Sequence, residues 1–458
     1  MNKKIYSDQE WNAIINNDTF CPAPFFSYYI DTNNTLAACC IHNTANERDF
    51  IDRPLAELYN SDFFKNLRRD LLTGVKNKTC NRCWKTEEIS TNSMRSGMLN
   101  WFKLWDASDR IRSSINEDYS LTDPTINYID VRFDNTCNLR CRSCFSHYST
   151  SWYAEEKAMK TQGVIPNSHT PVQFTNSTLT VDELKPTLDT CRRIYFAGGE
   201  PMVTPQHYEI LQYLIDKGRT DIEIYYNTNF SKLTHGKHDV IELWKHFKDV
   251  TIGASLDGSR ERGEYARKNI SWQQVEKNRQ RMIKEVPHVR FLVAATVSIM
   301  NAYDFPQHHR DWVERGFLGP GDYTINLLFG PANYAISNLP DHHKQRLKQI
   351  YKDHIGWVQD QIKSGVNRHP DRPQWWNGDF SSSWNIDFTV SGIEGLIKQL
   401  DQPRDPGSYN MWNRDLWLDL SRGENFFKTF PEYLDIRPEV FAALDKHHPD
   451  ADYSIWKS

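Results

Sequence analysis

Three cysteines crowd one short segment and constrain the fold of this chain more than any other feature. Cys137, Cys141 and Cys144 have the spacing C-x3-C-x2-C and directly follow an apolar segment, Ile126–Phe133, that is predicted to be a β-strand. Three thiolates on one tight loop can hold three corners of a cubane iron–sulfur cluster. The fourth iron then keeps an open position for a ligand.

The spacing alone leaves two other interpretations open. Free cysteines are often buried as ordinary core side chains. Zinc is a second possibility, although zinc sites usually combine C-x2-C pairs into sets of four ligands. The segments after the loop therefore decide how it is interpreted.

Composition sets the broad class of the protein. A chain of 458 residues is expected to hold more than one domain, and its 15 Trp, 21 Tyr and 23 Phe favour a folded, aromatic-rich core. A net charge of −4 gives no strong attraction to nucleic acid or anionic membranes. The start lacks the apolar stretch of a signal peptide, so we expect a cytoplasmic protein whose nine cysteines are reduced.

Between Ile126 and about Phe329, short apolar segments alternate with helical patterns, such as Tyr208–Ile215 and a helix capped by Ser271. This alternation predicts parallel βα units with right-handed crossovers. The six expected strands are Ile126–Phe133, Arg193–Ala197, Asp221–Asn227, Val250–Ser255, Val289–Val297 and Tyr323–Leu328.

The second expected strand ends in Phe196-Ala-Gly-Gly-Glu-Pro201, where Gly198 and Gly199 let the backbone approach a ligand and Glu200 adds a carboxylate. Taken alone, Gly-Gly-Glu-Pro is only a turn. One strand after C-x3-C-x2-C, however, it resembles the radical S-adenosylmethionine (radical SAM) enzymes. The resemblance implies an α/β fold with a partial (β/α)6 TIM-like barrel over residues 120–332. It also implies a [4Fe–4S] cluster on the three cysteines, with Gly198, Gly199 and Glu200 holding the methionyl amino group of SAM.

Further SAM contacts are expected at the ends of the next strands, where barrels place their chemistry. Thr228 and Asn229 match a Thr-Asn element of the family. Alternation along a strand puts Ser255 and Asp257 on one side of the backbone, where they resemble the polar contacts to the ribose and carboxylate, although an Asp-Gly turn is the simpler alternative. Arg267 is a candidate carboxylate clamp or, equally, a solvated surface arginine.

A second group of cysteines precedes the barrel. Cys80 and Cys83 form C-x2-C, with Cys21, Cys39 and Cys40 upstream and a predicted amphipathic helix, Leu55–Leu72, between. The order resembles the twitch or SPASM module of radical SAM enzymes, which binds an auxiliary [4Fe–4S] cluster. The resemblance implies this module at residues 1–110 with ligands Cys21, Cys39, Cys80 and Cys83. A strand sends Cys39 and Cys40 to opposite faces, so only one of them is expected to reach the metal, and the resemblance favours Cys39. Structural zinc is the alternative.

The last part, residues 333–458, is predicted to be a helical extension. Adjacent His342 and His343 are not at ligand spacing, and we expect both to be solvated. Lone Cys191 is expected in the core.

The implied activity is reductive cleavage of SAM to a 5′-deoxyadenosyl radical that abstracts hydrogen from a peptide, protein or small-metabolite substrate. An electron donor such as flavodoxin or ferredoxin is the implied partner, and no side chain is singled out as catalytic. A non-catalytic iron–sulfur or zinc-binding scaffold is the alternative function, and nucleic acid is disfavoured as a partner by the acidic net charge.

Overall fold

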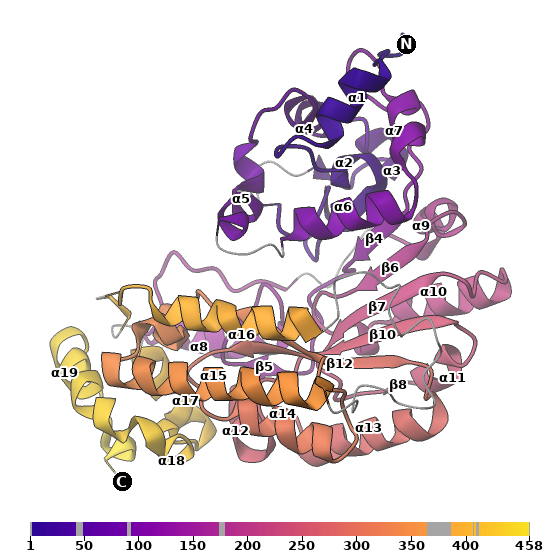
Figure 1. Cartoon of the computed structure of the whole chain (residues 1–458). Coiled ribbons are helices and arrows are strands. Elements are labelled where there is room, and N and C mark those ends of the chain that lie inside the picture. Colours follow the sequence, from indigo (N-terminus) through magenta and orange to yellow (C-terminus); the bar gives the residue numbers. More distant parts are fainter. Residues whose placement is uncertain are drawn as a thin grey trace. The chain divides into compact units, whose positions relative to one another are not determined.

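The structure is a computed structural model that describes residues 2–42, 49–88, 93–173, 179–363, 386–405, 407–408 and 412–457. The chain forms two compact units (Figure 1). Unit 1 comprises residues 1–135, 174–226 and 234–251, and unit 2 comprises residues 136–173, 227–233 and 252–458.

Unit 1 combines an N-terminal helical region with part of a sheet. Its helices are α1 (Asp8–Ile15), α2 (Ala23–Phe26), α3 (Leu55–Leu58), α4 (Asp62–Leu72), α5 (Asn81–Glu87), α6 (Met94–Leu104), α7 (Ser108–Ser114), α9 (Val181–Leu188), α10 (Pro205–Asp216) and α11 (Val240–Trp244). Its strands are β1 (Ser27–Ile30), β2 (Thr35–Ala37), β3 (Asp49–Phe50), β4 (Tyr128–Val131), β6 (Arg193–Phe196), β8 (Thr234–His235) and β9 (His238–Asp239), with most of β7 (Glu223–Thr228) and the first half of β10 (Asp249–Ala254).

The strand order in unit 1 is β7-β6-β4-β1-β2-β3. Strands β1, β4, β6 and β7 run parallel, with Ser27 opposite Tyr128 and Tyr128 opposite Arg193, whereas β2 and β3 are antiparallel additions. Every residue of β1 and β4 is buried, as expected of parallel strands covered on both faces. The N-terminal segment thus contributes a strand directly beside β4.

Unit 2 holds the remaining strands and most of the C-terminal helices. Its strands are β5 (Arg140–Cys141), the second half of β10, β11 (Arg267–Lys268), β12 (Arg290–Val297) and β13 (Tyr323–Leu327). Its helices are α8 (Tyr153–Thr161), α12 (Arg260–Ala266), α13 (Trp272–Glu285), α14 (Phe305–Glu314), α15 (Asp341–Lys363), α16 (Ile386–Leu400), α17 (Trp412–Arg422), α18 (Phe426–Thr429) and α19 (Arg437–His447).

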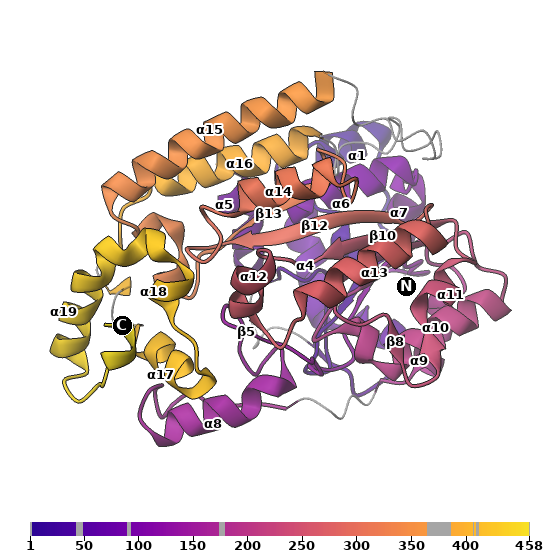
Figure 2. The same ribbon diagram turned by 90° about the horizontal axis from the view of Figure 1, so that it is seen from below.

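The strand order in unit 2 is β13-β12-β10, with β12 and β13 parallel, and β5 pairs separately with β11. Helices α15 and α16 lie side by side (Figures 1 and 2), and α16 packs on β13. A Cβ on Gly392 would lie 2.9 Å from the Cβ of Ile325, so this close approach needs glycine.

The six predicted strands are confirmed as β4, β6, β7, β10, β12 and β13. The cap at Ser271 is also confirmed, because its Oγ accepts a hydrogen bond from the Gln274 amide. The single helix predicted over Leu55–Leu72 is wrong: α3 ends at Leu58, and Ser61 caps a new helix, α4. Closure into a partial barrel and the division at 1–110, 120–332 and 333–458 stay predictions.

Two predictions about isolated residues have different outcomes. Cys191 is fully buried, as predicted. His342 is exposed but His343 is not: its ring donates to or accepts from Tyr303 Oη at 2.7 Å and Asp435 Oδ1 at 3.0 Å, so the prediction of a solvated pair is wrong. Within the described ranges, no helix has both the length and the apolar character that a membrane crossing requires.

Candidate metal and cofactor sites

The cysteine loop, residues 137–144, lies in unit 2 and is fixed by backbone pairing with β11. Strand β5 places Cys141 opposite Arg267 of β11, and the Arg142 amide donates to the Ala266 carbonyl at 2.8 Å. The Cys144 amide donates to the Cys141 carbonyl at 2.9 Å, which turns the chain tightly between these two cysteines. None of the three predicted ligands is part of a disulfide bond.

Arg267 and Asp257 lie together beside this loop. Arg267 Nη1 donates to Cys141 Sγ at 3.7 Å, and its Nε lies 2.8 Å from Asp257 Oδ2. The other carboxylate oxygen of Asp257 accepts from the Thr296 amide at 2.9 Å. The Arg267 side chain is only 12% exposed, so the interpretation as a solvated surface arginine is wrong.

The other predicted residues of unit 2 lie at the end of β7 and after β10. Asn229 Nδ2 donates to Asn138 Oδ1 at 3.0 Å and to Cys137 Sγ at 3.9 Å, so the Asn229 side chain contacts the cysteine loop. The Thr228 carbonyl accepts from the Ser255 amide at 2.7 Å, which joins these two residues through their backbones.

Burial raises the pKa of two of the loop thiols. It raises the pKa of Cys141 even though Arg267 acts in the opposite direction. Burial, with a smaller contribution from Cys141, raises the pKa of Cys144 to about 12. A coordinated metal deprotonates such thiols, so metal binding here is coupled to proton release.

Gly198, Gly199 and Glu200 lie in unit 1, at the end of β6. Gly198 has φ +113°, and a Cβ there would lie 3.0 Å from the Cβ of Arg132, so this turn needs glycine on two counts. Glu200 is 1% exposed, and its Oε1 accepts from the Met202 amide at 3.0 Å. The segment therefore combines a glycine-dependent turn with a buried carboxylate.

Four of the N-terminal cysteines line one cavity in unit 1, which we call the four-cysteine cavity. Its thiols come from the start of α2, the turn after β2, a short 3-10 turn and α5: Cys21, Cys39, Cys80 and Cys83. The other side chains around it are mainly apolar and include Trp84, Met94 and Met98, with Arg95.

Cys39 and Cys40 differ in their surroundings. Burial raises the pKa of Cys39, and the neighbouring thiols Cys40, Cys21, Cys80 and Cys83 raise it further. Burial and Asp130 raise the pKa of Cys40 to about 12. Strand β2 ends at Ala37, so both cysteines lie in a turn, and the expectation that strand alternation sends them to opposite faces does not apply. Their thiols nevertheless have different neighbours: Cys39 lines the four-cysteine cavity, and Cys40 lies against Asp130.

Some contacts on the cysteine loop come from residues that the sequence did not single out. The Cys141 carbonyl accepts from Trp152 Nε1 at 3.1 Å. Arg414 donates to the carbonyls of Arg142 at 3.0 Å and Cys144 at 3.2 Å. No local sequence pattern predicts Arg414 as a partner, because it lies 270 positions from Cys144. The charged Arg142 between two predicted ligand cysteines is the one signal that could have pointed to such partners.

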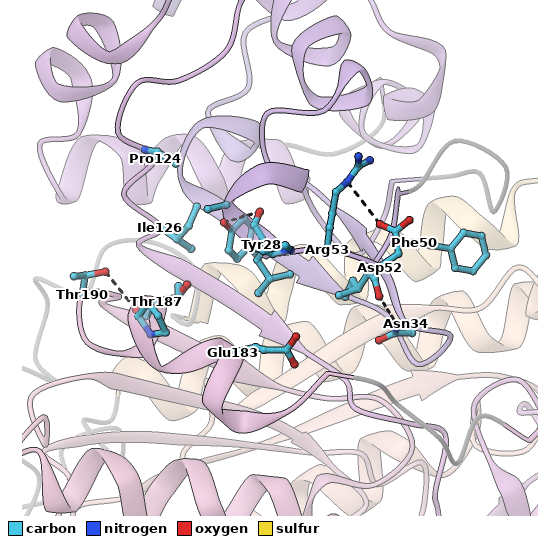
Figure 3. Close-up of a pocket in the computed structure, with 15 residues that line it drawn as sticks. Tyr28, Asn34, Phe50, Asp52, Arg53, Pro124, Ile126, Glu183, Thr187 and Thr190 are labelled. Atoms are coloured by element: carbon cyan, nitrogen blue, oxygen red, sulfur yellow. Dashed lines mark hydrogen bonds and ion pairs between the residues drawn. The ribbon is translucent and has the colours of Figure 1, made fainter.

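A cavity of about 830 Å³ also lies in unit 1 (Figure 3). Tyr28, Arg53, Glu183 and Thr187 are among its lining residues, and Arg53 Nε lies 3.6 Å from the adjacent Asp52 carboxylate. None of the predicted site residues lines it.

Comparison with protein families identifies the region around the cysteine loop. Residues 131–300 match the sequence model of the radical SAM superfamily. The matched region includes all three loop cysteines, Gly198–Glu200, Asp257 and Arg267, and it supports an enzyme of this superfamily. The superfamily implies a [4Fe–4S] cluster and SAM as cofactors. The loop fits such a cluster, because it offers three cysteine thiols within eight residues, with the cationic Arg267 beside Cys141.

Solved structures give only distant likenesses. The chain is similar to "Native anSMEcpe with bound AdoMet and Cp18Cys peptide", with 18% identity and a TM-score of 0.34 over 53% of this chain and 62% of that chain. It is also similar to Streptococcus suis SuiB bound to S-adenosylmethionine, with 11% identity and a TM-score of 0.36 over 72% and 69%. The chain thus spans less than two thirds of the length of the first, and no functional argument rests on either. No curated protein matches the chain.

Proposed function

We propose that this chain is a radical SAM enzyme that cleaves SAM reductively at a [4Fe–4S] cluster held by Cys137, Cys141 and Cys144. The observation that carries the proposal is the C-x3-C-x2-C loop inside the superfamily match at residues 131–300. When bound, such a cluster supplies the electron that splits SAM into methionine and a 5′-deoxyadenosyl radical, which then abstracts hydrogen from a substrate.

The chain's own residues hold and tune this site. Three thiolates bind the cluster and leave one iron open. Arg267, held by Asp257, places a positive charge against Cys141, and Asn229 donates toward the sulfur of Cys137. Cations and hydrogen bonds at ligand sulfurs favour the more negative, reduced state of a cluster, so these contacts favour electron uptake.

For SAM itself, we propose that Gly198, Gly199 and Glu200 hold the methionyl amino group. The glycine-dependent turn supports close backbone approach, and a buried carboxylate forms strong charge-assisted hydrogen bonds with a cation. Thr228, Asn229, Ser255, Asp257 and Arg267 are proposed for the ribose and carboxylate.

We also propose that Cys21, Cys39, Cys80 and Cys83 bind an auxiliary [4Fe–4S] cluster. The support is that four thiols line one cavity, a donor set that closes all coordination positions. Zinc would use the same four thiolates, so the metal must be measured. In this proposal residues 1–110 form a twitch- or SPASM-like module. The enzyme is cytoplasmic, takes electrons from a flavodoxin- or ferredoxin-type donor and acts on a peptide, protein or small metabolite.

The direct test is formation of 5′-deoxyadenosine by anaerobically reconstituted, dithionite-reduced protein. The triple variant Cys137→Ala/Cys141→Ala/Cys144→Ala should form none, because no thiolate remains to hold the cluster. Cys191→Ala is the matched control, since it removes a buried cysteine outside both sites and should leave the yield unchanged. Normal yield from the triple variant, or no product from the wild-type protein, contradicts the proposal; the second result favours a non-catalytic scaffold.

A further inference from the structure

The cysteine loop carries a charged residue that is completely buried. Arg142 lies between Cys141 and Cys144, and its side chain has 0% exposure. Its guanidinium contacts three carboxylates of the C-terminal region: Asp415 at 3.4 Å, Asp419 at 2.5 Å and Glu424 at 2.7 Å. Burying a guanidinium is costly unless it is paired, so the loop can take this path only when the carboxylates are in place.

These carboxylates are themselves fixed. Besides Arg142, Asp419 accepts hydrogen bonds from Tyr265 Oη at 2.8 Å, the Phe426 amide at 2.7 Å and Trp456 Nε1 at 2.7 Å. Asp415 is held by Asn333 and Tyr334. The Tyr265 ring covers the Arg142 guanidinium, with 3.8 Å between the ring centroid and the guanidinium carbon. Arg142 is therefore enclosed by carboxylates, of which Asp415 and Asp419 have further hydrogen-bond partners.

A second arginine, Arg414 of helix α17, binds the loop backbone. The Arg414 guanidinium donates to the Arg142 carbonyl and the Cys144 carbonyl, which a planar fork can do at once. It also lies 4.9 Å from the ring of Trp152, whose Nε1 donates to the Cys141 carbonyl. Side chains thus fix the backbone carbonyls of Cys141, Arg142 and Cys144.

The neighbouring packing supports the same arrangement. Figure 2 shows α17 close to α8, and buried Trp152, Met159 and Leu418 form a cluster that Cys144 contacts. Arg422, at the end of α17, forms an ion pair with Glu155 of α8, which also binds Arg140 of the loop. These contacts do not stop at the two helices. They reach the backbone carbonyls of Cys141 and Cys144, whose thiols are proposed ligands.

We infer that α17 and the residues just after it act as positioning residues for the cluster, through Arg414, Asp415, Asp419 and Glu424, which we call the α17 clamp. The inference gives the C-terminal extension a role in the radical SAM site and rests on the proposed function. The clamp sets the path of the loop from Cys141 to Cys144 and adds a positive charge, that of Arg414, next to Cys144.

The test compares Arg414→Ala and Arg414→Lys with wild-type protein as reconstituted full chain. Arg414→Lys keeps the charge but cannot reproduce the fork, and Arg404→Ala removes an exposed arginine as the matched control. Hydrogen–deuterium exchange should be about tenfold faster at the loop amides in Arg414→Ala, as expected from the loss of charged hydrogen bonds, and unchanged in α10. Arg414→Lys should fall between, and Arg404→Ala should match wild type.

A second readout separates positioning from general stability. The midpoint potential of the loop cluster, followed by electron paramagnetic resonance (EPR), should become more negative in Arg414→Ala, because a cation that favours the reduced state is gone, and stay near wild type in Arg414→Lys. Loop exchange and potential both equal to wild type in Arg414→Ala would overturn the inference, as would equal acceleration of exchange throughout unit 2. Failure of the proposed function looks different: the reduced, reconstituted wild-type protein then forms no 5′-deoxyadenosine.

Discussion

The two cysteine sites of this chain, the loop and the four-cysteine cavity, place their thiols in different surroundings. The loop site takes three thiols from eight consecutive residues and surrounds them with Arg267, Asn229 and the α17 clamp. The four-cysteine cavity collects its thiols from residues 21 to 83 and surrounds them mainly with apolar side chains. Three ligands with polar surroundings suit a metal centre that must bind a cosubstrate and change charge. Four ligands in apolar surroundings suit a closed centre.

The largest expected effect separates the two sites by metal content. Two [4Fe–4S] clusters require about eight irons, four per cluster. Replacing Cys80 and Cys83 together with alanine should remove about half of the iron and leave the loop cluster in place. Iron and zinc are measured by elemental analysis of anaerobic protein. One equivalent of zinc, about four irons and no iron lost in the double variant would instead identify the cavity as a zinc site.

A matched pair of neighbours sharpens the boundary of the closed site. Cys39→Ala should lose the metal of the four-cysteine cavity, whereas Cys40→Ala should retain it, because the Cys40 thiol lies against Asp130 instead. Both variants remove one partly buried thiol from the same turn, so each controls for the other. If both keep full metal content, this hairpin does not build the site.

The polar surroundings of the loop predict a large cost at Arg267. Arg267→Ala leaves the Asp257 carboxylate, only 7% exposed, without its cation, and losing one partner of a buried pair costs about 3–5 kcal/mol. Urea unfolding should show this loss. Arg404→Ala, which breaks an exposed pair with Glu439, should cost about 0–1 kcal/mol. Equal effects in the two variants would mean that the Arg267–Asp257 pair is no more than a surface contact.

A smaller effect is expected at Glu200. If its carboxylate binds the SAM amino group, Glu200→Ala should weaken SAM binding by about 1.5–3 kcal/mol while the iron content stays the same. Titration with SAM measures this change, and Glu183→Ala, an exposed carboxylate on α9, is the control. Unchanged affinity would remove Glu200 from the proposed SAM site.

Local signals account for what the sequence could predict. The strands, the Ser271 cap and the cysteine spacings each depend on residues within a few positions of one another. The sequence pattern does not predict the break between α3 and α4, because the apolar pattern continues past Ser61, the residue that caps α4. The α17 clamp could not be predicted from the sequence, because Arg414 and Arg142 are 272 positions apart and come into contact only in the folded chain. The contacts of His343 could not be predicted from its neighbours either, because its partner Asp435 lies 92 positions away.

The central claim is that the loop cluster is open to SAM and the cavity cluster is closed. EPR spectra of reduced protein, recorded with and without SAM, test this claim most directly when the Cys80→Ala/Cys83→Ala variant is compared with the Cys137→Ala/Cys141→Ala/Cys144→Ala variant. The account predicts that SAM changes the spectrum of the first variant, which keeps the loop cluster, and leaves that of the second unchanged. A SAM-dependent change in the second variant, or none in the first, would contradict it.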